Sequence, residues 1–210
     1  MKFVETIDNA VIEFVHLLCE KVGFILTPIM RLVSILGEKC WSCLLVAVVM
    51  LFRKKTRWIG ATAILAVFIG FIIADFGLRP TIMRLRPYMT NIDFQKYWEL
   101  AGAYHETNYS MPSGHTVGFT AFFVSLIITS PKKDRDFLKK LAAVCITLMV
   151  LSRCYFMHHF LSDCVVGFII GVISAYIAKI IIKGIHYICK KYEDLKFFDF
   201  ILNFDPAGKE

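Results

Sequence analysis

The chain has 210 residues, 57% of them apolar, and a formal net charge of +7. A soluble domain of this length does not need so apolar a composition, so we exclude that class and expect a polytopic membrane protein. The Lys and Arg residues cluster in short loops, a distribution typical of membrane topology and not of nucleic-acid binding.

The N-terminal stretch over residues 3–31 is amphipathic, with apolar residues at helical spacing. The pattern predicts a helix that either lies in the membrane interface or packs as an imperfect span. Both interpretations stay open at this point.

Apolar stretches of spanning length follow, at about residues 36–52, 58–76, 115–130, 141–157 and 164–182. We therefore expect an all-α fold, a polytopic transmembrane helical bundle with five clear spans plus the N-terminal amphipathic helix or sixth span. We divide the chain into an N-terminal helix (1–35), a transmembrane domain (36–183) and a cytoplasmic tail (184–210).

The charged loops predict the orientation of the bundle. Those at 53–57 and 131–140 are short and rich in Lys and Arg, so both should be cytoplasmic. Two predicted spans separate them, as two loops on one side require. The polar segment at 78–114 and the turn at 158–163 then face the other side. We expect a multi-pass protein of the cell membrane whose polar motifs gather on the non-cytoplasmic face.

A turn with the sequence Pro112-Ser113-Gly114-His115 precedes the third span. A turn that opens a helix leaves free backbone N–H groups at the positive end of the helix dipole, which suits an anion. The small Ser113 and Gly114 would let a ligand approach the backbone closely, with His115 beside it. On this motif alone, a histidine that merely caps a helix is an equal alternative.

Arg79, Arg84 and Arg86 lie on the predicted outer side and so break the positive-inside pattern. Arginines that snorkel at a helix end are one explanation. Phosphate ligands are the other, because guanidinium groups match phosphate in geometry and charge. Arg153 lies near the end of an apolar span, where an ionisable residue indicates a functional site. Asp75, one helical turn before Arg79, can pair with it, either within the site or as a purely structural ion pair.

Histidines and arginines around a helix N-terminus, without a Cys/His cluster or paired carboxylates, indicate phosphate chemistry with no metal and no cofactor. One imidazole can attack phosphorus and form a covalent intermediate. A second can protonate the leaving oxygen and then deprotonate water. Asp163, four residues after His159, can accept the Nδ1 proton of that histidine and fix its tautomer. The neighbouring His158 lacks this spacing, and we interpret it as a packing or interface residue.

Taken together, the motifs resemble those of the type 2 phosphatidic acid phosphatase (PAP2) family. They are Arg79-x6-Arg86-Pro87, Pro112-Ser113-Gly114-His115 and Ser152-Arg153-x5-His159-x3-Asp163. The resemblance covers about residues 36–183 and implies that this domain is catalytic. Arg79 departs from the family pattern, which usually has Lys there; Arg keeps the charge but is longer and forked.

The resemblance implies that His159 is the nucleophile, which becomes phosphohistidine, and that His115 is the general acid and then the general base. It implies that Asp163 supports His159. The phosphate ligands that it implies are Arg79, Arg86, Ser113, Gly114 and Arg153.

The function that the resemblance implies is an integral membrane phosphatase acting on a lipid phosphate or lipid diphosphate. Phosphatidic acid, phosphatidylglycerophosphate and undecaprenyl diphosphate are the substrate classes to consider. A lipid phosphotransferase on the same scaffold and a non-catalytic lipid-binding or transport protein stay open as alternatives. The expected partners are the lipid substrate and the bilayer, with no nucleic acid; no motif predicts an oligomeric state.

Overall fold

The computed structural model describes residues 2–206, and every regular element in that part of the chain is helical, as predicted. Two 3-10 turns, η1 (Glu38–Cys40) and η3 (Lys132–Asp134), and a π-helical segment, η2 (Ile72–Leu78), join the α-helices. The α-helices are α1 (Lys2–Gly37), α2 (Trp41–Leu51), α3 (Arg57–Phe71), α4 (Arg79–Ile82), α5 (Pro87–Thr90), α6 (Ile92–Ala101), α7 (Gly114–Thr129), α8 (Arg135–Tyr155), α9 (Leu161–Lys191) and α10 (Lys196–Asn203).

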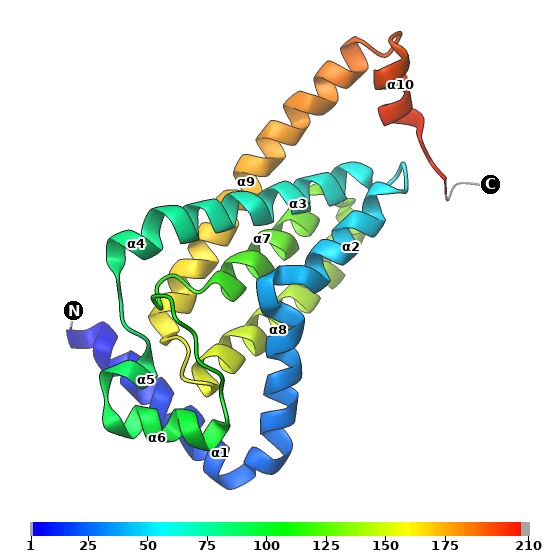
Figure 1. Ribbon diagram of the computed structural model, residues 1–210. Coiled ribbons are helices and arrows are strands. Elements are labelled where there is room, and N and C mark those ends of the chain that lie inside the picture. Colours follow the sequence, from blue (N-terminus) through cyan, green and yellow to red (C-terminus); the bar gives the residue numbers. More distant parts are fainter. Residues whose placement is uncertain (1, 207–210) are drawn as a thin grey trace.

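Helices α3, α7 and α9 form the centre of the bundle, with α2 packed on α3 and α8 packed on α7 (Figure 1). Small side chains let helix backbones approach closely, which is how helices associate where lipid removes the hydrophobic driving force. The small residues buried in the bundle include Ala63, Ala66, Ala121, Ala175 and Ala178.

Several helical runs have the length and composition of membrane spans. They are Lys2–Leu51, Arg57–Thr90 and Leu161–Lys191, together with the shorter apolar helix α7. α8 has 21 residues and contains the predicted span at 141–157 except for its last two residues. It is about 32 Å long by the usual rise of a helix, close to the ~30 Å of a hydrocarbon core. The chain is a helical membrane protein.

The N-terminal helix α1 bends at Val22 (φ −133°, ψ 17°), six residues before Pro28. Its first arm lies across the end of the bundle beside α6, and its second arm turns back along α8 (Figure 1). The predicted span at 36–52 begins within this run. α2 alone has 11 residues, about 16 Å, so the second arm and η1 have to supply the remaining length of that crossing.

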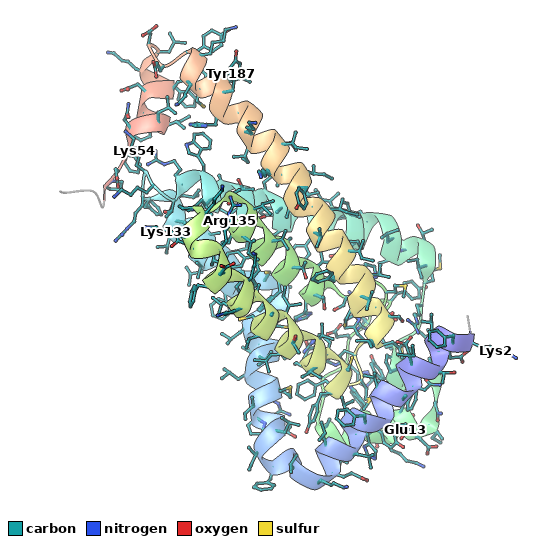
Figure 2. All side chains as sticks on the ribbon, turned by 180° about the vertical axis from the view of Figure 1, so that it is seen from behind. Lys2, Glu13, Lys54, Lys133, Arg135 and Tyr187 are labelled. Carbon is teal, nitrogen blue, oxygen red and sulfur yellow. The ribbon has the colours of Figure 1, made fainter. Side chains whose placement is uncertain are left out.

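The two ends of the bundle differ in character. The polar segment at 78–114 folds over one end as α4, α5, α6 and a loop, next to the turn between α8 and α9 (Figure 1). The basic loops lie at the other end, where Lys54, Lys133 and Arg135 are labelled in Figure 2. Both basic loops therefore share one end and both motif-bearing segments share the other.

α7 and α9 meet backbone to backbone at Gly167 and Gly171. A Cβ atom at Gly171 would lie 2.6 Å from Thr120 Cβ and 2.7 Å from the Val117 carbonyl oxygen. A Cβ atom at Gly167 would lie 2.8 Å from the Ser113 carbonyl oxygen. Any larger residue would push the helices apart, so the two glycines let α9 hold the first turns of α7.

We expect Gly171→Ala to destabilise the protein, because its methyl group would overlap backbone atoms of α7. Overpacking of this kind costs about 1–3 kcal/mol, so the thermal midpoint of the purified protein in detergent should fall. Gly184→Ala in the same helix is the matched control, since its Cβ would meet no atom within 4 Å. Alanine favours a helix over glycine by about 1 kcal/mol, so the control midpoint should hold or rise. Equal midpoints would contradict the close approach of α7 and α9.

Candidate active site

The predicted site residues meet at one end of the bundle, on the segment from α4 to α5, the start of α7 and the turn from α8 to α9. Contacts join these segments. Arg79 Nη2 donates to the Pro112 carbonyl oxygen at 3.1 Å, and Arg86 Nη1 lies 3.4 Å from His159 Nε2. The motifs, far apart in sequence, thus form one cluster.

The start of α7 is built into this cluster. The helix begins at Gly114 with Ser113 as its N-cap, and the Ser113 N–H donates to the Asp163 carbonyl oxygen at 3.1 Å. A Cβ atom at Gly114 would lie 3.4 Å from Arg79 Nη2. The first N–H groups of a helix lack intrahelical acceptors, so together with Arg79 they form a positive corner that suits phosphate.

His159 is enclosed, with 1% of its surface exposed. Its Nδ1 lies 2.6 Å from the Ser110 carbonyl oxygen; because a carbonyl oxygen can only accept, Nδ1 carries the proton. Nε2 therefore keeps its lone pair, and it faces Arg86. Burial lowers the pKa of the His159 imidazole well below its usual value, and the charge of Arg86 lowers it further.

Asp163 does not hold His159 in the way that its spacing predicts. Its Oδ2 is 3.8 Å from His159 Nδ1, too long for a hydrogen bond, and the Ser110 carbonyl takes its place as acceptor. Asp163 Oδ2 instead accepts the Phe160 backbone N–H at 2.8 Å, and Oδ1 accepts from Arg84 at 2.6 Å. A carboxylate in the first turn of a helix satisfies a free N–H at the helix start, and here this bond fixes the residue next to His159.

Arg86 is held in one orientation before any ligand arrives. It is 1% exposed. Its Nη1 donates to the His158 carbonyl oxygen at 2.8 Å, and its Nε donates to the Asn108 carbonyl oxygen at 2.8 Å. Its Nη2 donates to the Asn108 side chain at 2.5 Å. Fixed donors of this kind stabilise developing charge without reorganising.

Arg153 is fully buried and lies beside His115. Its Nη2 donates to Ser34 Oγ of α1, and its Nη1 lies 3.5 Å from His115 Nε2. A guanidinium group can only donate, so a neutral His115 turns a lone pair toward it. Within residues 2–206, Arg153 Nε has no hydrogen-bond partner. His115, the predicted general acid and base, therefore lies next to an arginine whose Nε–H donor is still available to a ligand.

The motifs did not point to Glu106, which lies in the loop before α7. Its Oε2 is 2.5 Å from Arg86 Nη2, and its Oε1 is 3.6 Å from Arg153 Nη1. Burial raises the pKa of Glu106, but neighbouring positive charges, Arg86 first and also Arg153, lower it, and its pKa ends below the usual value. An anionic carboxylate thus lies between two predicted phosphate ligands. One acidic residue in a polar loop carries no signal that would have revealed this position.

In the sequence, Arg84 is distinguished only as one of the arginines on the predicted outer side, and no motif includes Asp8. Arg84 donates to Asp163 Oδ1 at 2.6 Å and to Asp8 Oδ2 at 2.8 Å. Asp8 belongs to the first arm of α1 and is 1% exposed. Its position between Ile7 and Val11 places a carboxylate on the apolar face of that helix, which is the signal that could have found it.

The two remaining sequence expectations concern neighbours of the site. His158 is buried, with its Nε2 2.9 Å from the Tyr104 carbonyl oxygen. Burial, and then the charge of Arg153, lowers the pKa of His158 to about 4, so this histidine stays neutral. Asp75 pairs with Arg79, with 2.7 Å between Oδ1 and Nη1.

A cavity of about 1160 Å³ opens beside the cluster, between α1, the start of α9 and the segment before α6. Its lining is largely apolar and includes Ile7, Phe94, Phe160 and Val165, and Arg84 also borders it. Glu5 and Asp8 line it too, whereas none of the predicted catalytic or phosphate-binding residues does, so the cavity adjoins the cluster through neighbours of those residues such as Met111 and Phe160. An apolar cavity at this place suits the hydrocarbon chain of a ligand whose anionic head lies in the cluster.

Comparison with known proteins agrees with this geometry. The model of the PAP2 superfamily matches residues 55–185. Phosphatidylglycerophosphatase B of Bacillus subtilis (strain 168) is 26% identical over 163 residues, which are 73% of this chain and 74% of that protein. Undecaprenyl-diphosphatase of Sulfolobus acidocaldarius is 29% identical over 126 residues, which are 60% of this chain and 56% of that protein.

The fold is also similar to a solved structure. The crystal structure of a transmembrane PAP2-type phosphatidylglycerolphosphate phosphatase from Bacillus subtilis has a TM-score of 0.65 at 22% identity. The similarity covers 91% of this chain and 90% of that chain, so it extends over nearly the whole fold.

The lowered pKa of His159 predicts that this imidazole stays neutral in mild acid. A free histidine is half protonated at pH of about 6.5, whereas a lowered pKa means that the proton binds only after the pH has fallen further. We expect ¹⁵N NMR of histidine-labelled protein in micelles to show a neutral His159 ring at pH of about 6. His159→Gln identifies its signals. If His159 is instead half protonated at a pH of about 6.5 or higher, as a free histidine is, burial does not lower its pKa.

Proposed function

The chain belongs to the PAP2 superfamily, and from this premise we propose that it hydrolyses a lipid phosphate or lipid diphosphate through a phosphohistidine at His159. Its relatives are named as phosphatases, and the chain is a phosphoric ester hydrolase of the membrane. The observation that carries the mechanism is the placement of each histidine against a buried arginine, His159 at Arg86 and His115 at Arg153.

In the first step, Nε2 of His159 attacks phosphorus. An N–P bond forms as the bond to the leaving oxygen breaks, with the two roughly in line. His115 gives its proton to the leaving oxygen, so it enters this step protonated. The bound phosphate favours that state, because a nearby negative charge stabilises an imidazolium.

In the second step, water attacks the phosphohistidine and the N–P bond breaks. His115 now accepts a proton from the water, since the group that gave a proton in the first step is neutral. Inorganic phosphate leaves and His159 is restored. The Ser110 carbonyl oxygen holds the Nδ1 proton of His159 throughout, so Nε2 is ready for the next substrate.

Groups fixed in advance hold the charge of the transferred phosphoryl group. Arg86 and Arg153 are buried and oriented by protein acceptors, and such preorganised donors are the main source of electrostatic catalysis. Glu106 lies between them, so its carboxylate has to move or share these arginines as phosphate binds. The proposed phosphate ligands are Arg79, Arg86, Ser113, Gly114 and Arg153.

The proposed substrate is a lipid because the cluster lies at the end of a membrane bundle and borders an apolar cavity. The names of the relatives favour phosphatidylglycerophosphate and undecaprenyl diphosphate as the first lipids to test, with phosphatidic acid as a third. Water as the final acceptor distinguishes this proposal from phosphotransfer, because only hydrolysis releases inorganic phosphate.

We expect His159→Ala and His115→Ala to fail in different ways. His159 supplies the atom that bonds phosphorus, so its loss should abolish phosphate release and leave no labelled enzyme. His115 only moves protons, and general acid–base help is worth about 10²–10⁴-fold. With p-nitrophenyl phosphate, whose leaving group needs little protonation, the His115→Ala enzyme should still form a phosphoenzyme. That species should persist because water lacks its base.

The measurement is acid-labile, base-stable phosphate label on each purified variant, together with inorganic phosphate released from a panel of lipids. Asp163→Asn serves as an intermediate case, because the imidazole remains while its surroundings loosen. Label that survives in His159→Ala would show that the nucleophile is misassigned.

We also propose that the site faces the non-cytoplasmic side, because the basic loops lie at the opposite end of the bundle. In a background without the native cysteines, Gln95→Cys should react with an impermeant thiol reagent in intact cells. Lys133→Cys, also exposed in the structure, is the matched control and should react only after the cells are opened. The reverse pattern would invert the orientation and move the substrate to the inner leaflet.

A further inference from the structure

α1 lies outside residues 55–185, which the family model matches, yet both of its arms contact groups of the proposed site. Asp8 on the first arm reaches the start of α9, and Ser34 on the second arm accepts from Arg153. The Asp8 contact leads further, because a buried carboxylate is expensive unless charges and hydrogen bonds compensate it.

The acceptor atoms of Asp8 converge on the first turn of α9. Oδ1 accepts the Ser162 backbone N–H at 2.8 Å. Oδ2 accepts the Ser162 hydroxyl at 2.5 Å and Arg84 Nη2 at 2.8 Å. Ser162 is the second residue of α9, so a carboxylate from the other end of the chain caps this helix and meets the positive end of its dipole.

Arg84 extends the contact to Asp163. Its Nη1 donates to Asp163 Oδ1 at 2.6 Å, and its guanidinium carbon lies 4.1 Å from the centre of the Phe160 ring. One guanidinium thus bridges two carboxylates. The surplus negative charge is offset by the helix start, where the backbone N–H groups of Ser162 and Phe160 donate to Asp8 and Asp163.

We propose that Asp8 and Arg84 are positioning residues for the reaction. They hold Asp163 and the first turn of α9, and the Asp163 bond to the Phe160 N–H fixes the backbone that carries His159. The inference rests on the proposed function, which makes His159 the nucleophile. Position matters at this level, because a displacement of about 1 Å at a reacting group can reduce the rate about 100-fold.

Asp8→Asn tests the link, because it keeps the shape of the side chain but replaces an acceptor by an amide donor. We expect kcat for phosphate release from p-nitrophenyl phosphate, which has no hydrocarbon chain to enter the cavity that Asp8 lines, to fall by about 10–100-fold. Its KM should be nearly unchanged, since the phosphate ligands are untouched. The matched control is Glu13→Gln on the same arm (Figure 2), an exposed carboxylate that accepts from Tyr97 at 3.2 Å. It should keep the wild-type kcat.

A double-mutant cycle separates positioning from a general loss of stability. If Asp8 acts through Asp163, adding Asp8→Asn to Asp163→Asn should lower kcat hardly further. Multiplicative losses would overturn the proposal, and so would a wild-type kcat for Asp8→Asn. A wild-type protein that releases no phosphate from any lipid would instead sink the proposed function, and this inference with it.

Arg84→Lys covers the case in which Asp8→Asn does not fold. Lysine keeps the positive charge but has no fork with which to bridge two carboxylates. Its kcat should fall as in Asp8→Asn, again with KM nearly unchanged. An Arg84→Lys enzyme with wild-type kcat would overturn the proposal by itself.

Discussion

The burial of two cations, Arg86 and Arg153, is the constraint on which the rest of the site depends. They are 1% and 0% exposed at the end of an apolar bundle, where an unpaired charge is expensive. The fold supplies fixed acceptors for each. The His158 carbonyl and Asn108 hold Arg86, and Ser34 holds Arg153. These acceptors come from the turn before α9, the loop before α7 and α1. The segments that cover this end of the bundle therefore provide the acceptors that the two arginines need.

The protein compensates the positive charges of Arg86 and Arg153 only in part. Glu106 offers one negative charge to two guanidinium groups. In the described part of the chain, Nε of Arg79 and Nε of Arg153 have no hydrogen-bond partner. A bound phosphate brings more charge and more acceptor oxygens than one carboxylate. On the proposed mechanism, the positive charges of the arginines are therefore better compensated as negative charge gathers on the phosphoryl oxygens. The site then binds the transition state more strongly than the ground state, as catalysis requires.

The sequence predicts well where the signal is local and poorly where the partner is distant. The all-α fold and the start of α7 at Gly114 follow from apolar runs and a Pro/Gly turn. The amphipathic spacing over 3–31 also predicts the N-terminal helix, which α1 extends to Gly37, but it gives neither the bend at Val22 nor the packing on α8. No motif includes Asp8, whose partner Ser162 lies 154 residues away, although its place on the apolar face of the helix marks it. The acceptor of the proposed nucleophile is a loop carbonyl, and the position of a carbonyl leaves no trace in a pattern of side chains.

The motifs and their supports are under different physical demands. A phosphoryl group imposes one geometry on the groups that meet it, so those groups recur at fixed spacings and can be recognised in a single sequence. A support only has to place another side chain, and many residues on many elements can do that. Here Ser34 holds Arg153 and Asp8 acts on Asp163 through Arg84, although the family match begins only at residue 55. Supports of this kind can therefore come from parts of the chain that the family match does not include.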